Sequence, residues 1–595
     1  MNILGISCYY HDAAAALLRD GVLIAAAEEE RFSRKKHDYD FPKKAIQFCL
    51  ERGGISGPDL DYVVFFEKPF RKFDRILATV LQTYPRSWKV FRESMITWVL
   101  DKLWVASTLE SELGIPKRKV LFSEHHLSHA ASAYLCSPFD EAAILTVDGV
   151  GEWVTAAYGV GRGTDVQLTH QIEFPHSIGL LYSAFTAFLG FEVNEGEYKV
   201  MGMAPYGQPR YVDKVWKVVR QNQDGSFSLD MSYFSFHHST DRTFSQRFVE
   251  LFGEPRRPGL NFFTALTGFP KYFGPQPSDY EQLCRLNQEY ADIAASIQAV
   301  TEELLVGMAN HLHKQTGMKR LCIAGGVGLN SVANSRILSA TPFEELYIQP
   351  AAGDGGGALG AALWAYNTLL GKPRAFCMDH AYWGQEYSAG EISKFLNDSN
   401  IPYSRIDDED ALLDQTVNRL MQGKVVGWFQ GRFEWGPRAL GSRSILADAR
   451  NPEMKDIVNS KIKFREPYRP FAPSVLAHCA ERYFDLPRAA CHYPARYMLY
   501  VVPVKENHQA ELPAVTHVDG TARLQTVFRD GNPRYYDLIE RFGRATGTPV
   551  LLNTSFNLRG EPIVNTPANA FSTFSNSEMD CLVLGDFIVD KHSLH

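Results

Sequence analysis

The amino-acid sequence predicts an α/β protein whose front half is a duplicated, ribonuclease-H-like domain. A three-strand meander opens the chain, the same pattern returns after residue 141, and two strand–glycine–helix units follow the second copy. A fresh α/β pattern starts near residue 407, after a Gly-Lys-Pro break at 371–373. We therefore expect two domains, at 1–370 and 407–595, joined by a linker at 371–406.

The meander signal consists of short apolar runs separated by turn residues. The first copy has predicted strands at 2–8, 13–18 and 22–27, and the second at 142–147, 153–160 and 166–172. Each copy has a polar group at its first turn: His11 and Asp12 in the first, and Asp148 in the second. The repeat lies in the pattern and not in residue identities.

Glycine-rich turns follow two further apolar strands, at 320–330 and 346–357, and the second leads into a helix predicted at 358–370. Glycines such as Gly325 and Gly326 let backbone amides approach a ligand at a helix N-terminus, where the partial positive charge favours phosphate. We therefore place both glycines among the predicted nucleotide contacts. A plain tight turn is the alternative. In the second domain, the pattern predicts a helix at 412–422 and a strand at 425–429.

Composition and charge argue against several classes of protein. The chain has 595 residues and a formal net charge of −7, which argues against broad non-specific binding to nucleic acid. Its nine cysteines form no CxxC pair, so they indicate no zinc ribbon, and they fit a reducing cytosol. The chain opens without a signal-peptide pattern, and its longest apolar stretch, 178–191, predicts a buried helix. We expect a cytoplasmic protein that does not enter a membrane.

Two histidines in the segment 124–129 (EHHLSH) have the spacing of metal ligands. His125 and His129 are four residues apart and would project from one face of a helix; His126 and His129, three apart, could do the same. Asp148 ends an apolar strand and Asp354 lies among glycines, so neither carboxylate has a packing role. Together they predict a mixed nitrogen and oxygen site for Fe²⁺, Mn²⁺ or Zn²⁺, which the residues alone do not distinguish. Histidines satisfied within the core are the alternative.

Two further features near the N-terminus suit a site that handles an alcohol and a phosphate. An imidazole at the turn that holds His11 suits a general base that deprotonates a hydroxyl, and a plain turn histidine is the alternative. A cationic run follows at 31–37 (RFSRKKH). Its plainest interpretation is a solvated surface, but phosphate or adenylate would use one or two of these cations, foremost Lys36.

The second domain concentrates cations and short polar side chains. They are Arg438, Arg443, Lys463, Arg465 and Arg469, followed by Asn553, Ser555 and Asn557 directly after an apolar strand. Ser555 and Asn557 share one face of an extended segment, so both can reach one ligand. Arginine binds phosphate oxygens in a two-pronged fashion and lysine acts as a point charge, so the set predicts a polyanion pocket. Surface charge beside a capping turn is the alternative.

These segments resemble the NodU/CmcH family of O-carbamoyltransferases over nearly the whole chain. The motifs that carry the resemblance are Tyr10-His-Asp-Ala, Glu28-Glu-Glu-Arg-Phe, His125-His-Leu-Ser-His-Ala, the segment 197–207 (EYKVMGMAPYG), Ala324-Gly-Gly-Val, the segment 431–443 (GRFEWGPRALGSR) and Asn553-Thr-Ser-Phe-Asn557. Their occurrence together, in this order, makes the resemblance specific.

The resemblance implies an N-terminal domain of the actin-like ATPase superfamily, similar to the enzyme that makes threonylcarbamoyladenosine in tRNA, and a YrdC-like α/β C-terminal domain. The C-terminal domain would convert carbamoyl phosphate and ATP, with Mg²⁺, to carbamoyl adenylate. The N-terminal domain would then transfer the carbamoyl group to a hydroxyl of a small-molecule natural product.

The resemblance also implies roles for single residues. His125, His129, Asp148 and Asp354 would hold a divalent metal, foremost Fe²⁺, with Mn²⁺ and Zn²⁺ as alternatives. His11 would be the base, and Lys36 would help to hold the adenylate. Lys463-Phe-Arg465 and Ser555-Phe-Asn557 match the YrdC motifs.

The sequence does not identify the acceptor alcohol. Its pocket is expected within 68–113 and 224–278, whose aromatic content suggests a partly apolar wall. A small-molecule kinase of the actin-like superfamily would leave the C-terminal cations unused, and the net charge of −7 weakens a tRNA-modifying alternative. A non-enzymatic scaffold would have no use for the His/Asp set. A homodimer is the default expectation.

Overall fold

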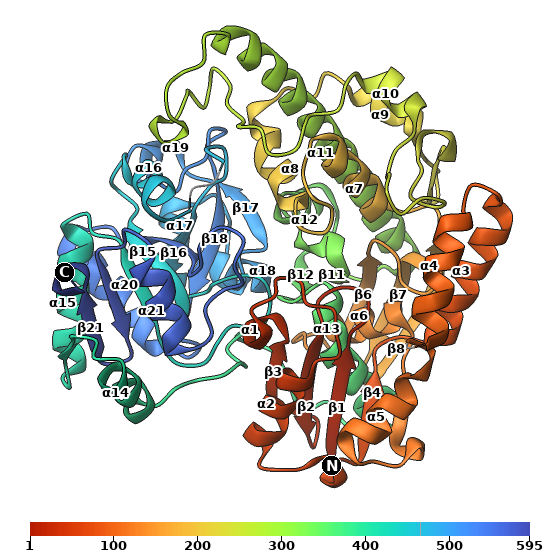
Figure 1. Ribbon diagram of the computed structural model, residues 1–595, viewed down its shortest axis with the longest axis horizontal. Coiled ribbons are helices and arrows are strands. Elements are labelled where there is room, and N and C mark those ends of the chain that lie inside the picture. Colours follow the sequence, from red (N-terminus) through yellow and green to blue (C-terminus); the bar gives the residue numbers. More distant parts are fainter. Residues whose placement is uncertain (101, 464–465, 595) are drawn as a thin grey trace. The chain divides into compact units, whose positions relative to one another are not determined.

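The computed structural model describes residues 1–100, 102–463 and 466–594, and it divides into two compact units (Figure 1). Unit 1 consists of Met1–Ala26, Tyr39–Gly268 and Pro277–Met378. Unit 2 consists of Ala27–Asp38, Phe269–Gln276 and Asp379–His595. The early segment Ala27–Asp38 therefore folds with the second half of the chain. The range predicted as a linker, 371–406, includes α14 (Ala389–Asp398) and β13 (Ser404–Arg405), and both belong to unit 2.

Unit 1 contains two five-stranded sheets with the same topology, ordered β3-β2-β1-β4-β5 and β8-β7-β6-β11-β12 (Figure 1). In each sheet the first two strands pair antiparallel, and the two later strands run parallel to the first. The first sheet consists of β1 (Asn2–Ser7), β2 (Ala14–Arg19), β3 (Val22–Glu28), β4 (Tyr62–Phe65) and β5 (Val120–Phe122). The second consists of β6 (Glu141–Val147), β7 (Val154–Arg162), β8 (Asp165–Glu173), β11 (Arg320–Ala324) and β12 (Glu345–Ile348). The α/β class and the repeated meander predicted from the sequence are confirmed.

Two helices, α6 (His125–Tyr134) and α13 (Asp354–Leu363), link the two sheets. α13 packs on β1 and β2, α6 packs on β6 and β11, and the two helices pack on each other. Glycines permit this close approach: a Cβ at Gly5 would lie 1.8 Å from the Ala358 carbonyl oxygen, and one at Gly360 would lie 1.8 Å from the Ser128 carbonyl oxygen. The packing places the first residues of both helices, His125 and Asp354, at the same site.

The start of α13 corrects a sequence prediction. The helix was expected from residue 358, but it begins at Asp354 and includes the glycines at 355–357. Glycine disfavours a helix by about 1 kcal/mol relative to alanine, and burial against β1 and α6 outweighs that preference. Asp354 therefore lies in the first turn of a helix, where the helix dipole favours a carboxylate.

The remaining helices of unit 1 surround this centre. They are α2 (Lys43–Gly53), α3 (Pro69–Thr83), α4 (Trp88–Leu100), α5 (Val105–Leu113), α7 (Ile178–Phe188), α8 (Glu197–Met203), α9 (Val212–Val218), α10 (Gln246–Phe252), α11 (Tyr280–Thr316) and α12 (Ser331–Ala340), with a small sheet of β9 (Val219–Gln221) and β10 (Phe227–Leu229). α7 confirms the buried helix predicted from the longest apolar stretch. Among the described residues, every helix is too short or too polar to cross a bilayer.

Unit 2 is built on one mixed sheet of nine strands, ordered β13-β21-β20-β14-β15-β19-β16-β18-β17. Beyond β13, its strands are β14 (Val426–Phe429), β15 (Arg443–Asp448), β16 (Ala472–Leu476), β17 (Tyr500–Pro503), β18 (Thr521–Val527), β19 (Val550–Ser555), β20 (Cys581–Leu584) and β21 (Phe587–Asp590). Its helices are α1 (Glu30–Ser33), α14, α15 (Glu409–Met421), α16 (Met454–Val458), α17 (Ala480–Tyr483), α18 (Tyr493–Arg496), α19 (Glu506–Gln509), α20 (Pro533–Thr546) and α21 (Pro567–Ser575). α15 and α20 pack on the sheet through an apolar core that includes Leu412, Trp428 and Leu538. The helix and strand predicted at 412–422 and 425–429 are confirmed as α15 and β14.

Candidate active site

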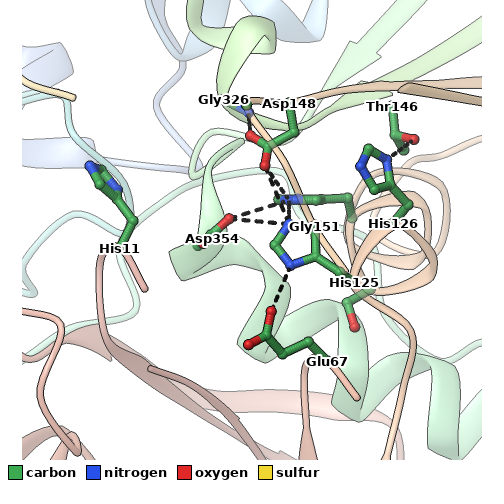
Figure 2. A network of polar contacts seen from close by, with 12 residues as sticks. His11, Glu67, His125, His126, Thr146, Asp148, Gly151, Gly326 and Asp354 are labelled. Carbon is green, nitrogen blue, oxygen red and sulfur yellow. Dashed lines mark hydrogen bonds and ion pairs between the residues drawn. The ribbon is translucent and has the colours of Figure 1, made fainter. Parts of the chain in front are cut away.

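Unit 1 brings together the four residues predicted as metal ligands. His125 and His129 project from the first turns of α6, Asp148 follows β6, and Asp354 begins α13 (Figure 2). All four are buried, and their ligand atoms lie within 4.8 Å of one another. The spacing rule that predicted one helical face for both histidines is confirmed.

The distances within this cluster suit a cation. The Nε2 atoms of His125 and His129 are 3.1 Å apart. His125 Nε2 lies 3.3 Å from Asp148 Oδ2, and both imidazoles lie 3.5 Å from Asp354 Oδ1. Ligands about 2.0–2.2 Å from one ion lie roughly 3–3.5 Å from each other. Asp354 Oδ2 is buried without a hydrogen-bond partner among the described residues, so this carboxylate has a second oxygen available to a cation. The residues therefore fit a divalent metal.

The electrostatics of the cluster show strong coupling between its charges. Burial alone would lower the pKa of His125, but the carboxylates of Asp354, Asp148 and Glu67 raise it to about 10. Burial would raise the pKa of Asp148, but its hydrogen bond to His125 and the charges of His129 and His125 lower it well below its usual range. The Asp148 carboxylate thus stays ionised and attracts a positive charge, whether a proton or a metal.

His126 lies outside the cluster. Its Nδ1 is 2.8 Å from Thr146 Oγ1 (Figure 2), and burial, together with His125 and His129, lowers its pKa well below the ordinary value. Of the two pairings left open by the sequence, the structure therefore selects His125 with His129.

Several residues that support the cluster were missed by sequence reasoning. Glu67 Oε2 lies 3.3 Å from His125 Nδ1 and 2.7 Å from Lys72 Nζ. The carboxylate of Glu152 accepts from the backbone N–H of His125 at 3.1 Å. Glu67 comes just after an apolar strand, β4, which is the signal that identified Asp148, so the same rule could have found it.

The predicted nucleotide contacts Gly325 and Gly326 lie beside this cluster. The Gly326 amide donates to Asp148 Oδ1 at 2.8 Å and so orients that carboxylate (Figure 2). Gly325 has φ = +96°, and a Cβ there would lie 2.2 Å from the Val147 carbonyl oxygen. The turn therefore needs a glycine at position 325, and the contact of both glycines with a nucleotide stays a prediction.

His11 lies in the turn between β1 and β2 and is separate from the cluster (Figure 2). Its Nδ1 is 2.8 Å from Asp12 Oδ2, and a Cβ on Gly353 would lie 3.9 Å from that oxygen. The pair therefore lies next to the turn that carries Asp354. Burial would lower the pKa of His11, but Asp12, and beyond it Asp354 and Asp148, raise it to about 10.

Unit 2 brings together three of the predicted cation-pocket residues. Lys463 Nζ lies 2.8 Å from Asn557 Oδ1 and 3.4 Å from Ser555 Oγ, and it donates to the backbone carbonyls of both residues. Ser555 Oγ in turn donates to Asn557 Oδ1 at 2.7 Å. Lys463 is only 4% exposed, so these contacts hold a buried ammonium group at the end of β19.

Two other predicted pocket residues are hydrogen-bonded within the protein. Arg443 is wholly buried and donates from its terminal nitrogens to four backbone carbonyls, those of Gln430, Ser442, Gln385 and Gly431. Burial lowers its pKa to about 10 despite nearby Glu434. Asn553 Nδ2 donates to Ser474 Oγ, Gln525 Oε1 and the Ala439 carbonyl oxygen. Both side chains support the strands around the pocket, and the phosphate contact predicted for them stays a prediction.

The last predicted residues are spread around unit 2. Arg438 is partly exposed, and Arg469 Nη1 lies 3.5 Å from Glu466 Oε2. Lys36 is partly exposed and belongs to the segment Ala27–Asp38 of unit 2. Arg465 lies outside the described residues.

The segment that contains Lys36 also holds a turn of unit 2. Arg31 Nη2 donates to the Gly436 carbonyl oxygen at 2.8 Å, and Glu28 Oε1 accepts from the Gly436 amide at 2.8 Å. Arg31 is 3% exposed, and its guanidinium lies 4.5 Å from the centre of the Phe433 ring. Both backbone polar groups of Gly436 are therefore held by residues from the start of the chain.

Comparison with known proteins gives matches along most of the chain. Residues 2–363 match the family described as carbamoyltransferase N-terminus, and residues 417–591 match the one described as carbamoyltransferase C-terminus. The chain is 46% identical to an uncharacterised protein of Synechocystis, over 99% of this chain and 97% of that protein. It is 37% identical to nodulation protein NolNO of Sinorhizobium fredii, over 98% of this chain and 80% of that protein. It is also 36% identical to the 3'-hydroxymethylcephem-O-carbamoyltransferase of Amycolatopsis lactamdurans, over 45% of this chain and 48% of that protein.

One unit of this α/β protein has a buried cluster of imidazoles and carboxylates, and the other has a buried lysine pocket. Such clusters are typical of enzymes. The two matches cover the regions that carry these clusters, and the chain belongs to the carbamoyltransferase family. The resemblance to the NodU/CmcH group is thereby confirmed, and the protein is an enzyme that transfers carbamoyl groups.

Proposed function

We propose that this enzyme is an ATP-dependent O-carbamoyltransferase whose two units perform two successive reactions. Unit 2 forms carbamoyl adenylate, and unit 1 transfers the carbamoyl group to a hydroxyl of a small-molecule natural product. The observation that carries the proposal is the presence of two chemically different polar clusters, one in each unit. The name of the cephem relative, which states an O-carbamoyl transfer, supports a hydroxyl acceptor.

Activation is needed because a carbamoyl group is a poor electrophile: its nitrogen donates electrons into the carbonyl. Carbamoyl phosphate, ATP and water would give carbamoyl adenylate, phosphate and pyrophosphate, so that AMP becomes the leaving group. In unit 2, the ammonium group of Lys463, held by Ser555 and Asn557, would attract the phosphate oxygens. Arg438, Arg469 and Arg465 are the further cations proposed for this pocket. The proposal treats unit 2 as YrdC-like and unit 1 as actin-like.

Transfer would take place at the His/Asp cluster of unit 1. His125, His129, Asp148 and Asp354 would hold the divalent metal, for which Fe²⁺ is our first choice, with Mn²⁺ and Zn²⁺ as alternatives. When bound, such a metal supplies a Lewis acid that polarises a carbonyl or phosphoryl oxygen. His11 would take the proton of the acceptor hydroxyl in its neutral form, which a cation held by Asp354 and Asp148 would favour by offsetting two of the charges that raise its pKa. Asp12, 2.8 Å away, would stabilise the imidazolium that results. The side chain of Lys36 would contribute a positive charge to the adenylate.

The test is mass spectrometry of panels of alcohols incubated with the full-length enzyme and carbamoyl phosphate, with and without ATP. Aminoglycosides, polyketides and guanidinium alkaloids are suitable panels. We expect a carbamoyl mass gain on one class that requires both carbamoyl phosphate and ATP. A phosphoryl mass gain with ADP as product would instead show a kinase, and a carbamoyl gain without ATP would contradict the adenylate step.

A further inference from the structure

Glu67, in the turn between β4 and α3, contacts the candidate metal centre from the outside. Its Oε2 lies 3.3 Å from His125 Nδ1, while His125 Nε2 faces Asp148 and Asp354 on the other side of the ring (Figure 2). The side chains of His125 and Glu67 are 0% and 4% exposed. Each nitrogen of this imidazole therefore has its own carboxylate neighbour in a region without solvent.

This arrangement determines which nitrogen carries the hydrogen. An ionised carboxylate can only accept a hydrogen bond, so His125 Nδ1 must donate to Glu67; once the imidazole gives up its second proton to bind a cation, the lone pair of Nε2 points into the cluster. An imidazole that binds a cation through Nε2 requires this tautomer. His129 differs, because its Nδ1 is buried with no hydrogen-bond partner among the described residues.

Lys72 keeps Glu67 in place and ionised. Its Nζ lies 2.7 Å from Glu67 Oε2, and its side chain is 2% exposed. A buried carboxylate without a partner would be costly, and the pairing with a buried ammonium group removes that cost. Lys72 comes from the first turns of α3, which directly follows Glu67, so the pair is built within a few residues of chain.

The backbone at Glu67 is itself attached to the helix that carries His125. The hydroxyl of Ser128, in α6, donates to the Phe66 carbonyl oxygen at 2.8 Å. The rings of Phe66 and His125 are 5.2 Å apart, centre to centre. These two contacts and the ion pair with Lys72 therefore hold the Glu67 carboxylate in position relative to the imidazole.

We propose that Glu67, supported by Lys72, is a positioning residue that sets the tautomer and orientation of His125 for cation binding. The inference rests on the proposed function in one respect, namely that the His/Asp cluster binds a cation. Carboxylates that hold a ligating histidine in this way typically change metal affinity by about 10–100-fold.

The experiment is calorimetric titration of Mn²⁺ into the chelator-treated full-length protein. We expect Glu67→Gln to weaken Mn²⁺ binding by about 10–100-fold and Glu67→Asp to recover part of the loss. Glu124→Gln is the matched control, because Glu124 directly precedes His125 but pairs with Lys68 and Arg71 and is 40% exposed. Its affinity for Mn²⁺ should equal that of the wild type.

A second variant guards against a folding defect. Glu67→Gln combined with Lys72→Met leaves no unpaired charge, so this protein should fold, as checked by circular dichroism, and still bind Mn²⁺ weakly. Wild-type affinity in both folded variants would overturn the inference and leave the proposed metal centre standing. Absence of Mn²⁺ binding in the wild type, with Zn²⁺ and Fe²⁺ equally inert, would overturn the metal centre and this inference with it.

Discussion

The single residue on which most of the account depends is His125, and its protonation gives a direct prediction. Its pKa is raised to about 10 by Asp354, Asp148 and Glu67, so the metal-free imidazole is protonated at pH 7. A cation must displace that proton, and we expect release of about one proton per metal bound. Calorimetry in buffers of different ionisation enthalpy measures this number. Binding without proton release would contradict the charge state described here.

The raised pKa of His125 also predicts how the stability of the metal-free protein depends on pH. Because the folded pKa lies above the unfolded value of 6.5, the stabilisation from protonated His125 is complete below that value and is lost as the pH rises through about 10. The unfolding temperature of the metal-free protein should therefore fall between these pH values, and His125→Asn should reduce that fall.

Gly151, which lies beside His125, gives a further prediction for a single residue. A Cβ at Gly151 would lie 2.8–2.9 Å from atoms of the His125 side chain, so Gly151→Ala must displace the imidazole. We expect metal affinity to fall at least tenfold, an effect of about 1.4 kcal/mol. Gly149→Ala is the matched control, because nothing lies within 4 Å of its added Cβ. Equal affinities for the two variants would show that the imidazole can move without consequence.

The element scale concerns the contact between α6 and α13, which brings His125 and Asp354 together. A Cβ at Gly360 would lie 1.8 Å from the Ser128 carbonyl oxygen, so Gly360→Ala should push the helices apart and cost about 1–3 kcal/mol of unfolding free energy. Gly390→Ala, on the exposed side of α14, should be neutral or slightly stabilising. Differential scanning calorimetry compares the two, and an unchanged unfolding temperature for Gly360→Ala would mean that the helices are not in close contact.

Helix α1 and the end of β3 give a second prediction at this scale. Because Arg31 and Glu28 hold the carbonyl and the amide of Gly436 near Arg438, Arg31→Met should slow the adenylate-forming reaction proposed for unit 2 at least fivefold. Metal binding at the His/Asp cluster should not change. Lys35→Met is the control, since Lys35 is 51% exposed at 3.5 Å from Asp38. Pyrophosphate release measures the reaction, and equal rates for both variants would show that the turn does not depend on Arg31.

Features set by neighbouring residues were predicted from the sequence, and features set by contacts between distant residues were missed. The strands of both meanders were predicted within one or two residues, because apolar runs and turn residues are local signals. The start of α13 was missed because packing outweighed the low helix propensity of its glycines. The contact of Arg31 with Gly436 spans 405 positions, so no local pattern reveals it. The position of Glu67 after a strand is a local signal, but its contact with His125, 58 positions away, is not. The burial of Arg443 and Asn553 was also missed, because charge and polarity alone do not reveal it, and their part in the pocket stays a prediction.

At the scale of the whole molecule, each unit has one half-reaction in the proposed function. The chain belongs to a carbamoyltransferase family whose two matched regions correspond to the two polar clusters. An activated carbamoyl group and its acceptor need different partners, namely phosphate-binding cations for activation, and a base with a metal for transfer. In the proposed function, two separate clusters would meet these two needs.

The most direct test of this division is carbamoyl-phosphate-dependent exchange of labelled pyrophosphate into ATP, measured alongside carbamoyl transfer in two variants of the full-length enzyme. His125→Ala should exchange pyrophosphate at the wild-type rate and lose transfer at least a hundredfold. The double variant Ser555→Ala with Asn557→Ala should lose exchange and, with it, transfer. Loss of the same half-reaction in both variants, or normal exchange in the double variant, would contradict the assignment of activation to unit 2.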